Sequence, residues 1–359
     1  MFHVFMFTSS CSRLHLFTFY VFTFYGPLPT LVIPPTILIL TPMRVLISGA
    51  AGFVGSHLTD LLLSQGHEVV GLDNFITGHR RNIAHLQDNA RFKLIQHDVT
   101  EPVKIDGAID QVYHLASPAA PAAYARHRIA TMKVNSQGGW NLLDLAVEKN
   151  ARYLVASTSE IYGDPLAHPQ KEDYWGNVNP VGLRSMYEEG KRFAEAIAMA
   201  YQRERDADTR IIRIFNTYGP RMDPNDGRVV TSFVRQALLG ENLTIYGDGS
   251  QTRSLMYVSD LVRGMTAVMD CDFHEPINLG NPDEVTIGQL ARDVIDLVPG
   301  TKSKVVFEPS PGYDPRVRKP DILRARQMLS WTPVVPRKEG LGKVAQYFRD
   351  VLGIGPQTR

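Results

Sequence analysis

A tyrosine and a lysine four positions apart, Tyr187 and Lys191, are the residues whose types and spacing could do chemistry most directly. The stretch that contains them, SMYEEGKRFAEAIAMAYQRER (185–205), has the pattern of a helix, which puts both side chains on one face. A phenol with a pKa near ~10 is a poor base at neutral pH, but nearby cations favour the phenolate. On its own the pair could equally decorate a surface. A nucleotide-binding motif earlier in the sequence would favour the interpretation of Tyr187 as a catalytic base.

Hydroxyl and carboxylate side chains, Thr158-Ser159-Glu160, stand before this helix in the stretch STSEIYGD (157–164). They follow an apolar run at 153–156 that predicts a buried strand. If that strand belongs to a nucleotide-binding sheet, its carboxyl end faces the ligand, and these side chains point at a reacting sugar or alcohol.

The elements that must position these residues begin at Met43 with the order strand, glycine turn, helix, strand. An apolar strand at 45–47 precedes Gly49-x-x-Gly52-x-x-Gly55, and a second strand ends at Asp73. Glycines allow a tight turn and a close approach of backbone to a pyrophosphate, which the helix N-terminus binds. The motif predicts dinucleotide binding. Asp73 can accept hydrogen bonds from ribose hydroxyls and favours NAD over NADP, although Arg80 and Arg81 nearby could bind a 2′-phosphate.

Further strand patterns at 91–99, 111–117, 152–157 and 210–216 alternate with helical or loop sequence. This succession predicts an α/β fold with a doubly wound parallel (Rossmann) sheet and a smaller α/β substrate-binding domain. We expect the NAD-binding domain at 43–215 and a mainly substrate-binding domain at 216–359, in which 276–298 could return to the sheet. Asp98, Val99, Ala116, Ser117 and Pro118 follow predicted strands and should lie at the ligand edge of the sheet.

Composition narrows the class of partner. The 359 residues are 44% hydrophobic and 21% charged, and their net charge of +1 offers no basic excess for a nucleic-acid backbone. The two cysteines are too few for a disulfide framework or a cysteine-built zinc site, and no metal site is expected. A small-molecule partner is therefore favoured.

The order of these motifs from Met43 to about Trp331 resembles the extended short-chain dehydrogenase/reductases that act on nucleotide sugars. The resemblance implies that Tyr187 is the catalytic base, that Lys191 positions it, and that Thr158 shares the proton of the substrate hydroxyl. The stretches RIFNTYGPRM (213–222), DGRVV (226–230), LTIYGDGSQTRSLMYVSD (243–260) and YDPRVRKPD (313–321) look like its nucleotide-sugar segments.

The same resemblance assigns the remaining site residues. The cofactor would contact Gly49, Gly52, Phe53, Val54, Gly55, Asp73, Asn74, Asp98, Val99, Leu115, Ala116, Ser117, Tyr187 and Lys191. The substrate would contact Pro118, Lys133, Asn216, Arg228, Tyr246, Arg253 and Arg318.

Within this family, Thr158-Ser159-Glu160 and the stretch EDYWGNVNPVGLRSMYEEGKR (172–192) are most similar to the branch that decarboxylates UDP-glucuronate to UDP-xylose with tightly bound NAD. Glu160, Ser159 and Arg253 would then lie beside the sugar carboxylate and ring. The 4,6-dehydratases carry an acid where Ser159 stands, and the 4-epimerases usually carry a small or hydroxyl residue where Glu160 stands. A 4-epimerase or dehydratase is the alternative enzyme. An NAD-binding regulator without turnover is a third interpretation, which intact Tyr187, Lys191 and Thr158 argue against.

Residues 1–42 differ from the rest, since they are rich in Phe, Tyr and Thr and carry Arg13 as their one fixed charge. We interpret them as an extension outside the fold of a cytoplasmic protein. Residues 14–40 are long enough for a membrane anchor, the alternative, but their prolines and Gly26 would break a spanning helix. The resemblance also implies a homodimer, formed by long helices around 122–149 and 185–205.

Overall fold

The computed structural model describes residues 6–11, 14–19, 21–23, 30–32, 41–309 and 318–355. Contacts divide the chain into two units, Met1–Met43 and Arg44–Arg359. The first unit holds two antiparallel pairs, β1 (Met6–Cys11) with β2 (Leu14–Phe19) and β3 (Val21–Thr23) with β4 (Thr30–Val32). The rest of the expected extension, and with it most of the alternative anchor over 14–40, lies outside the described residues. None of the helices in the described ranges combines the length and the apolar character that a membrane crossing requires.

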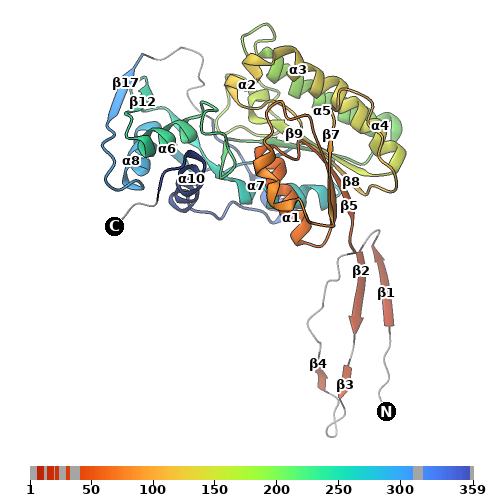
Figure 1. The fold of residues 1–359 in the computed structure, drawn as a ribbon. Helices are drawn as coiled ribbons and strands as arrows, with labels where there is room; N and C mark the ends of the chain where they lie inside the picture. Colours follow the sequence, from red (N-terminus) through yellow and green to blue (C-terminus); the bar gives the residue numbers. More distant parts are fainter. Residues whose placement is uncertain are drawn as a thin grey trace. The chain divides into compact units, whose positions relative to one another are not determined.

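The larger unit is built on a seven-stranded parallel sheet (Figure 1) with the order β15-β10-β9-β8-β5-β6-β7. Its strands are β5 (Arg44–Ser48), β6 (Glu68–Asp73), β7 (Phe92–Gln96), β8 (Gln111–His114), β9 (Arg152–Thr158), β10 (Thr209–Ile214) and β15 (Ile277–Leu279). Within the sheet, the path of the chain begins at β5, proceeds to one edge through β6 and β7, and then crosses back to β8. This reversal makes the switch point at which such sheets bind ligands. The expected doubly wound parallel sheet is confirmed.

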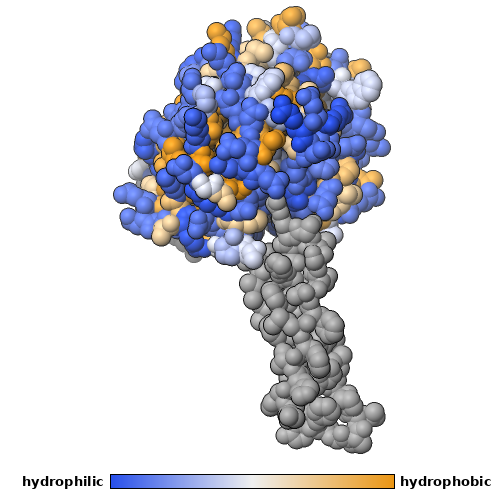
Figure 2. All heavy atoms as spheres, turned by 90° about the vertical axis from the view of Figure 1, so that its right-hand side faces the viewer, coloured by the Kyte–Doolittle hydropathy of each residue, from blue (hydrophilic) through white to orange (hydrophobic). Residues whose placement is uncertain are grey.

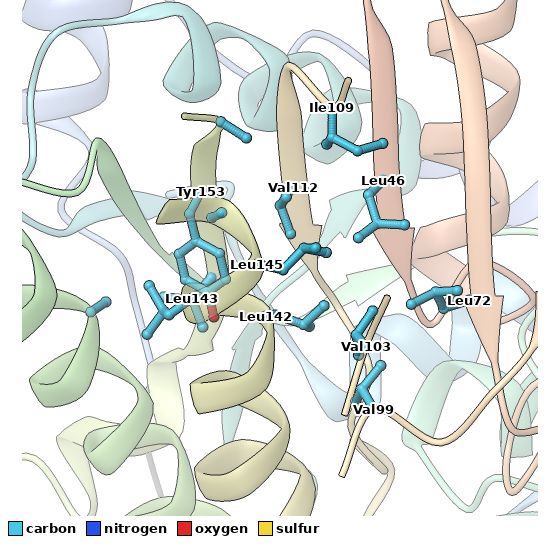
Figure 3. Packing of buried hydrophobic residues seen from close by; sticks show 14 of the residues in the cluster. Leu46, Leu72, Val99, Val103, Ile109, Val112, Leu142, Leu143, Leu145 and Tyr153 are labelled. Carbon is cyan, nitrogen blue, oxygen red and sulfur yellow. The ribbon is translucent and has the colours of Figure 1, made fainter. Parts of the chain in front are cut away.

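Helices cover the sheet and bury its apolar strands. The helices α1 (Phe53–Ser64) and α7 (Val258–Asp270) pack on each other and on the sheet, as do α4 (Gly139–Lys149) and α5 (Ser185–Arg205) on its other side. Figure 3 shows Leu142, Leu143 and Leu145 of α4 against Leu46 and Val112 of the sheet. All five side chains are at most 3% exposed, and burying each stabilises the fold by about 1.5–3 kcal/mol.

The long helix expected around 122–149 is interrupted. It consists of α2 (Pro121–Arg126), α3 (Arg128–Lys133), the π-helical turn η3 (Val134–Gly138) and α4. His127, between α2 and α3, has non-helical angles (φ −116°, ψ 46°). At the π turn the backbone comes close to the turn that follows β7, because a Cβ on Gly138 would lie 2.9 Å from Cγ2 of Val99. The helix expected around 185–205 is the continuous α5.

Among the residues that the structure describes, the larger unit also holds three small strand pairs and four further helices. The pairs are β11 (Thr217–Tyr218) with β14 (Met256–Tyr257), β12 (Leu243–Tyr246) with β17 (Val305–Glu308), and β13 (Thr252–Ser254) with β16 (Glu284–Thr286). The helices are α6 (Val229–Leu239), α8 (Ile287–Asp296), α9 (Leu323–Leu329) and α10 (Arg337–Leu352), and short 3₁₀ turns are η1 (Arg80–Asn82), η2 (Ala84–Leu86) and η4 (Ser159–Tyr162). Residues 276–298 supply β15 to the main sheet and α8 to the smaller part. The domain boundary near 215 stays a prediction, since 44–359 is one compact unit by contacts.

Candidate active site

A cavity of about 1390 Å³ lies at the carboxyl ends of the central strands. Typical sites for one small ligand measure about 300–1,000 Å³, so this cavity has room for more than one. It is lined by many of the residues expected from the sequence: Gly49, Gly52, Phe53, Val54, Gly55, Leu115, Ser117, Thr158, Ser159, Glu160, Tyr187, Lys191, Asn216, Arg228, Tyr246, Arg253 and Arg318. The fold thus brings cofactor and substrate candidates into one space.

The glycine turn between β5 and α1 has the form that a pyrophosphate needs. Gly49 has φ +77°, and a Cβ there would lie 2.9 Å from the backbone nitrogen of Ala116. A Cβ on Gly55 would lie 2.0 Å from the carbonyl oxygen of Gly49, so only glycine fits. Gly52 is the N-cap of α1 and offers no side-chain cap, which leaves the first N–H groups of the helix for phosphate oxygens. The residues therefore fit a dinucleotide.

Asp73 ends β6 beside this turn and is 7% exposed. Its Oδ2 accepts a hydrogen bond from the N–H of Ala51 at 2.9 Å, and its Oδ1 accepts one from the N–H of Phe75 at 2.8 Å. Burial raises the pKa of this carboxyl above its ordinary value, while both hydrogen bonds lower it. Each oxygen keeps a lone pair for a ribose hydroxyl.

Seven of the assigned residues are not among those that line the cavity: Asp73, Asn74, Asp98, Val99, Ala116, Pro118 and Lys133. Asn74 donates a hydrogen bond to Asp98 at 2.9 Å, and Lys133 is exposed at the end of α3. Their direct contacts with cofactor or substrate stay predictions.

Tyr187, Lys191 and Thr158 lie together in the wall of the cavity. The Nζ of Lys191 donates a hydrogen bond to the carbonyl of Ala156 at 2.8 Å and lies 5.9 Å from the centre of the Tyr187 ring. The ring of Tyr124 stacks on that of Tyr187 with centroids 4.8 Å apart. Burial raises the pKa of Tyr187 well above its usual value, and the charge of Glu160 raises it further. The hydrogen bond with Thr158 and the charges of Arg228 and Arg184 lower it.

Glu160 lies in a cluster of charges on the substrate side of Tyr187. It forms ion pairs with Arg184 and, at 3.8 Å, with Arg318, and Arg184 also approaches Glu188 at 3.6 Å. Sequence reasoning did not single out Arg184, which also lines the cavity. The signal was its position three residues before Tyr187, which puts both on one helix face.

Arg228, Tyr246 and Arg253 also line the cavity. Arg228, the N-cap of α6, forms an ion pair with Asp226 at 2.8 Å. Tyr246 ends β12 and is 50% exposed. Arg253 on β13 is 9% exposed and donates a hydrogen bond to the carbonyl of Thr252 at 2.7 Å. Of the YDPRVRKPD stretch, residues 313–317 lie outside the described residues.

Comparison with protein families places residues 45–280 on the model of the NAD dependent epimerase/dehydratase family. The chain belongs to this family. Its members have NAD as their cofactor, as the description of the family states, so the cofactor expected from Gly49, Gly52 and Gly55 is confirmed. Membership also confirms the resemblance read from the sequence.

Two curated family members are similar over most of the chain. The UDP-glucuronic acid decarboxylase 1 of Xenopus tropicalis is 53% identical over 86% of this chain and 73% of its own length. The UDP-glucuronic acid decarboxylase 5 of Arabidopsis thaliana is 51% identical over 87% of this chain and 91% of its own.

Solved structures of the family share the fold. The UDP-glucuronic acid 4-epimerase of Bacillus cereus, in complex with UDP-glucuronic acid and NAD, is 28% identical with a TM-score of 0.76 and covers 86% of this chain and 100% of its own. The UDP-glucose 4-epimerase of Thermotoga maritima, with UDP-glucose, is 28% identical with a TM-score of 0.78 and the same coverage. The sheet of this chain is thus the fold that these solved structures share.

Proposed function

We propose that this protein decarboxylates UDP-glucuronate to UDP-xylose and uses NAD without net consumption. The observation that carries the proposal is the 53% identity to a UDP-glucuronic acid decarboxylase. The site supports it, because Tyr187, Thr158 and Glu160 line one cavity together with Arg184, Arg253 and Arg318.

The reaction has to create a place for the electrons of the broken bond. A carboxylate on carbon 5 of a sugar loses carbon dioxide reluctantly, since the carbanion that remains is unstabilised. A ketone at carbon 4 makes the substrate a β-keto acid, whose decarboxylation leaves an enolate. NAD supplies the redox chemistry, taking a hydride from carbon 4 and returning it after the enolate has been protonated at carbon 5.

Tyr187 removes the proton of the 4-hydroxyl in this account. Burial favours the neutral phenol, so the phenolate requires positive charge nearby. Lys191 supplies it, oxidised NAD bound at this site would add to it, and Thr158 donates its hydrogen bond to the phenolate. When the enolate forms, the hydroxyls of Tyr187 and Thr158 donate hydrogen bonds to its oxygen. The stacked ring of Tyr124 covers Tyr187 and excludes water.

Glu160 and the arginines around it act on the carboxylate end of the sugar. Arg184 and Arg318 are both paired with Glu160, and arginine binds carboxylates through two parallel hydrogen bonds. The substrate carboxylate competes with Glu160 for these cations. Because Glu160 neutralises part of the charge of the arginines, they stabilise the substrate carboxylate less strongly. The loss of that carboxylate as carbon dioxide is then less costly in free energy.

The alternative enzyme is a 4-epimerase, which would reduce the same ketone from its other face and keep the carboxylate. The similar structure of a UDP-glucuronic acid 4-epimerase makes this the second candidate. Incubation with UDP-glucuronate and NAD, followed by mass analysis, separates the two. Decarboxylation gives UDP-xylose, lighter by one carbon dioxide, whereas an epimer of unchanged mass would overturn the proposal. Unchanged substrate with tightly bound NAD would favour the regulator.

We further propose that two copies pair through α3, α4 and α5. Exposed apolar residues on these helices are Ile129, Met132, Trp140, Val147 and Phe193. Trp140 of α4 contacts Tyr201 of α5 edge-to-face at 6.4 Å, so the two helices present a joint surface. Figure 2 looks onto the side of the molecule on which α4 lies in Figure 1 and shows apolar side chains among hydrophilic ones, a mixture usual for an interface.

Sedimentation of the double variant Ile129→Asp/Trp140→Asp tests the dimer. The variant should sediment as a monomer, whereas the parent should sediment as a dimer. Leu323→Asp, a change of an exposed apolar residue on α9, is the matched control and should leave the dimer intact. A monomeric parent would contradict the pairing.

A further inference from the structure

A largely buried carboxylate, Glu195, lies beneath the catalytic residues without a part in the chemistry described so far. It follows Lys191 by four positions on α5, as Lys191 follows Tyr187. This spacing puts all three side chains on one face of the helix. The Glu195 side chain is 12% exposed, and that of its partner Arg213 on β10 is 10% exposed.

Glu195 ties three elements of the fold together. The hydroxyl of Ser157, on β9, donates a hydrogen bond to its Oε1 at 2.5 Å. Arg213 donates to both carboxylate oxygens, through Nε to Oε1 at 3.0 Å and through Nη2 to Oε2 at 2.8 Å. Such two-pronged arginine contacts fix direction as well as distance.

Arg213 extends this network toward the loop that follows Glu160. Its Nη1 donates hydrogen bonds to the hydroxyl of Tyr162 at 3.0 Å and to the carbonyl of Glu172 at 2.7 Å. The Tyr162 hydroxyl in turn donates to Oδ1 of Asn278, on β15, at 2.8 Å. The two charged side chains of the network, Glu195 and Arg213, are paired with each other. A buried polar network whose groups have partners holds the elements that it joins rigidly in place.

The contacts of Glu195 and Lys191 converge on adjacent residues of β9. The carbonyl of Ala156 accepts from Lys191, the hydroxyl of Ser157 donates to Glu195, and the next residue is Thr158. We propose that Glu195 is a positioning residue for the reaction: it fixes the end of β9 against α5 and holds the ammonium form of Lys191 in place beside Tyr187. Its catalytic consequence rests on the proposed function, but its effect on Lys191 does not.

The electrostatics of Lys191 agree with this role. Burial lowers the pKa of Lys191 to about 7, and the charge of Glu195 opposes that fall. Burial lowers the pKa of His114 on β8 to about 3, and the charge of Lys191 lowers it as well, so that His114 is neutral at working pH. Three further titratable side chains belong to these elements. Tyr187 lies on α5 itself. Burial raises the pKa of Tyr153 on β9, and Arg213 on β10 is paired with Glu195. Glu195 is thus the carboxylate that acts on Lys191.

The direct test is an NMR titration of the lysine side chains in the NAD-loaded enzyme, with the Lys191 signal assigned through Lys191→Met. Glu195→Gln should lower the titration midpoint of Lys191 by about one pH unit or more, the usual effect of an opposite charge at close range. Ser157→Ala removes a hydrogen bond but keeps the charge, and its midpoint should equal that of the parent. An unchanged midpoint in Glu195→Gln would overturn the proposal.

Because Glu195→Gln leaves Arg213 unpaired in the core, Glu195→Gln/Arg213→Gln is measured beside it and should show the same downward shift. The pH profile of substrate oxidation gives the second readout. The alkaline limb, where Lys191 loses its proton, should move to lower pH in both variants, whereas purely structural damage would lower the rate equally at all pH values. A parent that fails to oxidise UDP-glucuronate would refute the proposed function, while the titration would still decide the role of Glu195.

Discussion

Glu160 forms an ion pair with Arg184, a residue that stands three positions before Tyr187 at the N-cap of the same helix. The contact joins the turn after β9 to the start of α5. In the proposed reaction, this end of α5 would supply both the base for the 4-hydroxyl and a cation for the carboxylate, with Glu160 between them.

Glu160→Gln should slow decarboxylation or protonation more than the first hydride transfer, which depends on Tyr187, Lys191 and Thr158. Loss of a charge-assisted contact costs about 1.5–3 kcal/mol, or roughly 10–100-fold in the affected step. In a single turnover with UDP-glucuronate, the nicotinamide absorbance should rise and persist, with 4-keto sugar on the enzyme. Arg253→Gln should behave alike if it acts at the same step. Variants that only weaken substrate binding would show no such signal at saturation.

Tyr187→Phe should abolish reduction of bound NAD and spare NAD binding. A positioned general base contributes about 10²–10⁴-fold, and the ring that stacks on Tyr124 is retained in phenylalanine. Calorimetry of NAD binding checks that binding is spared, and the rate of NADH formation checks that reduction is abolished. Substantial remaining turnover would remove Tyr187 from the mechanism.

Much of this site could be predicted because its residues follow local rules. The spacing of Gly49, Gly52 and Gly55 fixes a turn, and strand patterns fix which ends face the ligand. The spacing of Arg184 from Tyr187 follows a local rule, but its pairing with Glu160 does not. Glu195 was beyond such rules, since it matters through partners distant in the sequence, Arg213 and Ser157. The break at His127 has no glycine or proline at that position to announce it.

Asp73→Ala should weaken NAD binding by about 10–100-fold and relax discrimination against NADP, because hydrogen bonds to a charged acceptor contribute about 1.5–3 kcal/mol. The substitution also removes the acceptor for the N–H groups of Ala51 and Phe75. Asp73→Asn, which keeps an acceptor but loses the charge, separates the two effects. Titration with both cofactors measures them, and an unchanged preference would place the discriminating acid elsewhere.

The lowered pKa of Lys191 predicts that the stability of the fold depends on pH. Its pKa is lowered by burial to about 7, below its ordinary value in the unfolded chain, so the unfolded state binds more protons between these two values. The free energy of unfolding should therefore rise with pH from about 7 upward, by at most ~1.4 kcal/mol per pH unit from this group. Urea unfolding of the parent and Lys191→Met at several pH values checks the sign. A parent that lost stability relative to Lys191→Met over this range would contradict it.

Deletion of residues 1–42 should leave folding and turnover intact, because the compact unit that holds the site begins at Arg44. Circular dichroism and the decarboxylation rate of the shortened chain test this. An insoluble or inactive product would show that the extension belongs to the working protein.

The central claim is that oxidation, loss of carbon dioxide and reduction occur in one site with one bound cofactor. UDP-glucuronate carrying deuterium at carbon 4 tests it most directly. The label should leave carbon 4 with the hydride and return to the same carbon, so mass spectrometry and NMR should find UDP-xylose with deuterium at carbon 4 and without the carboxyl carbon. A product that keeps its carboxylate, or UDP-xylose that has lost the label to solvent, would contradict the account.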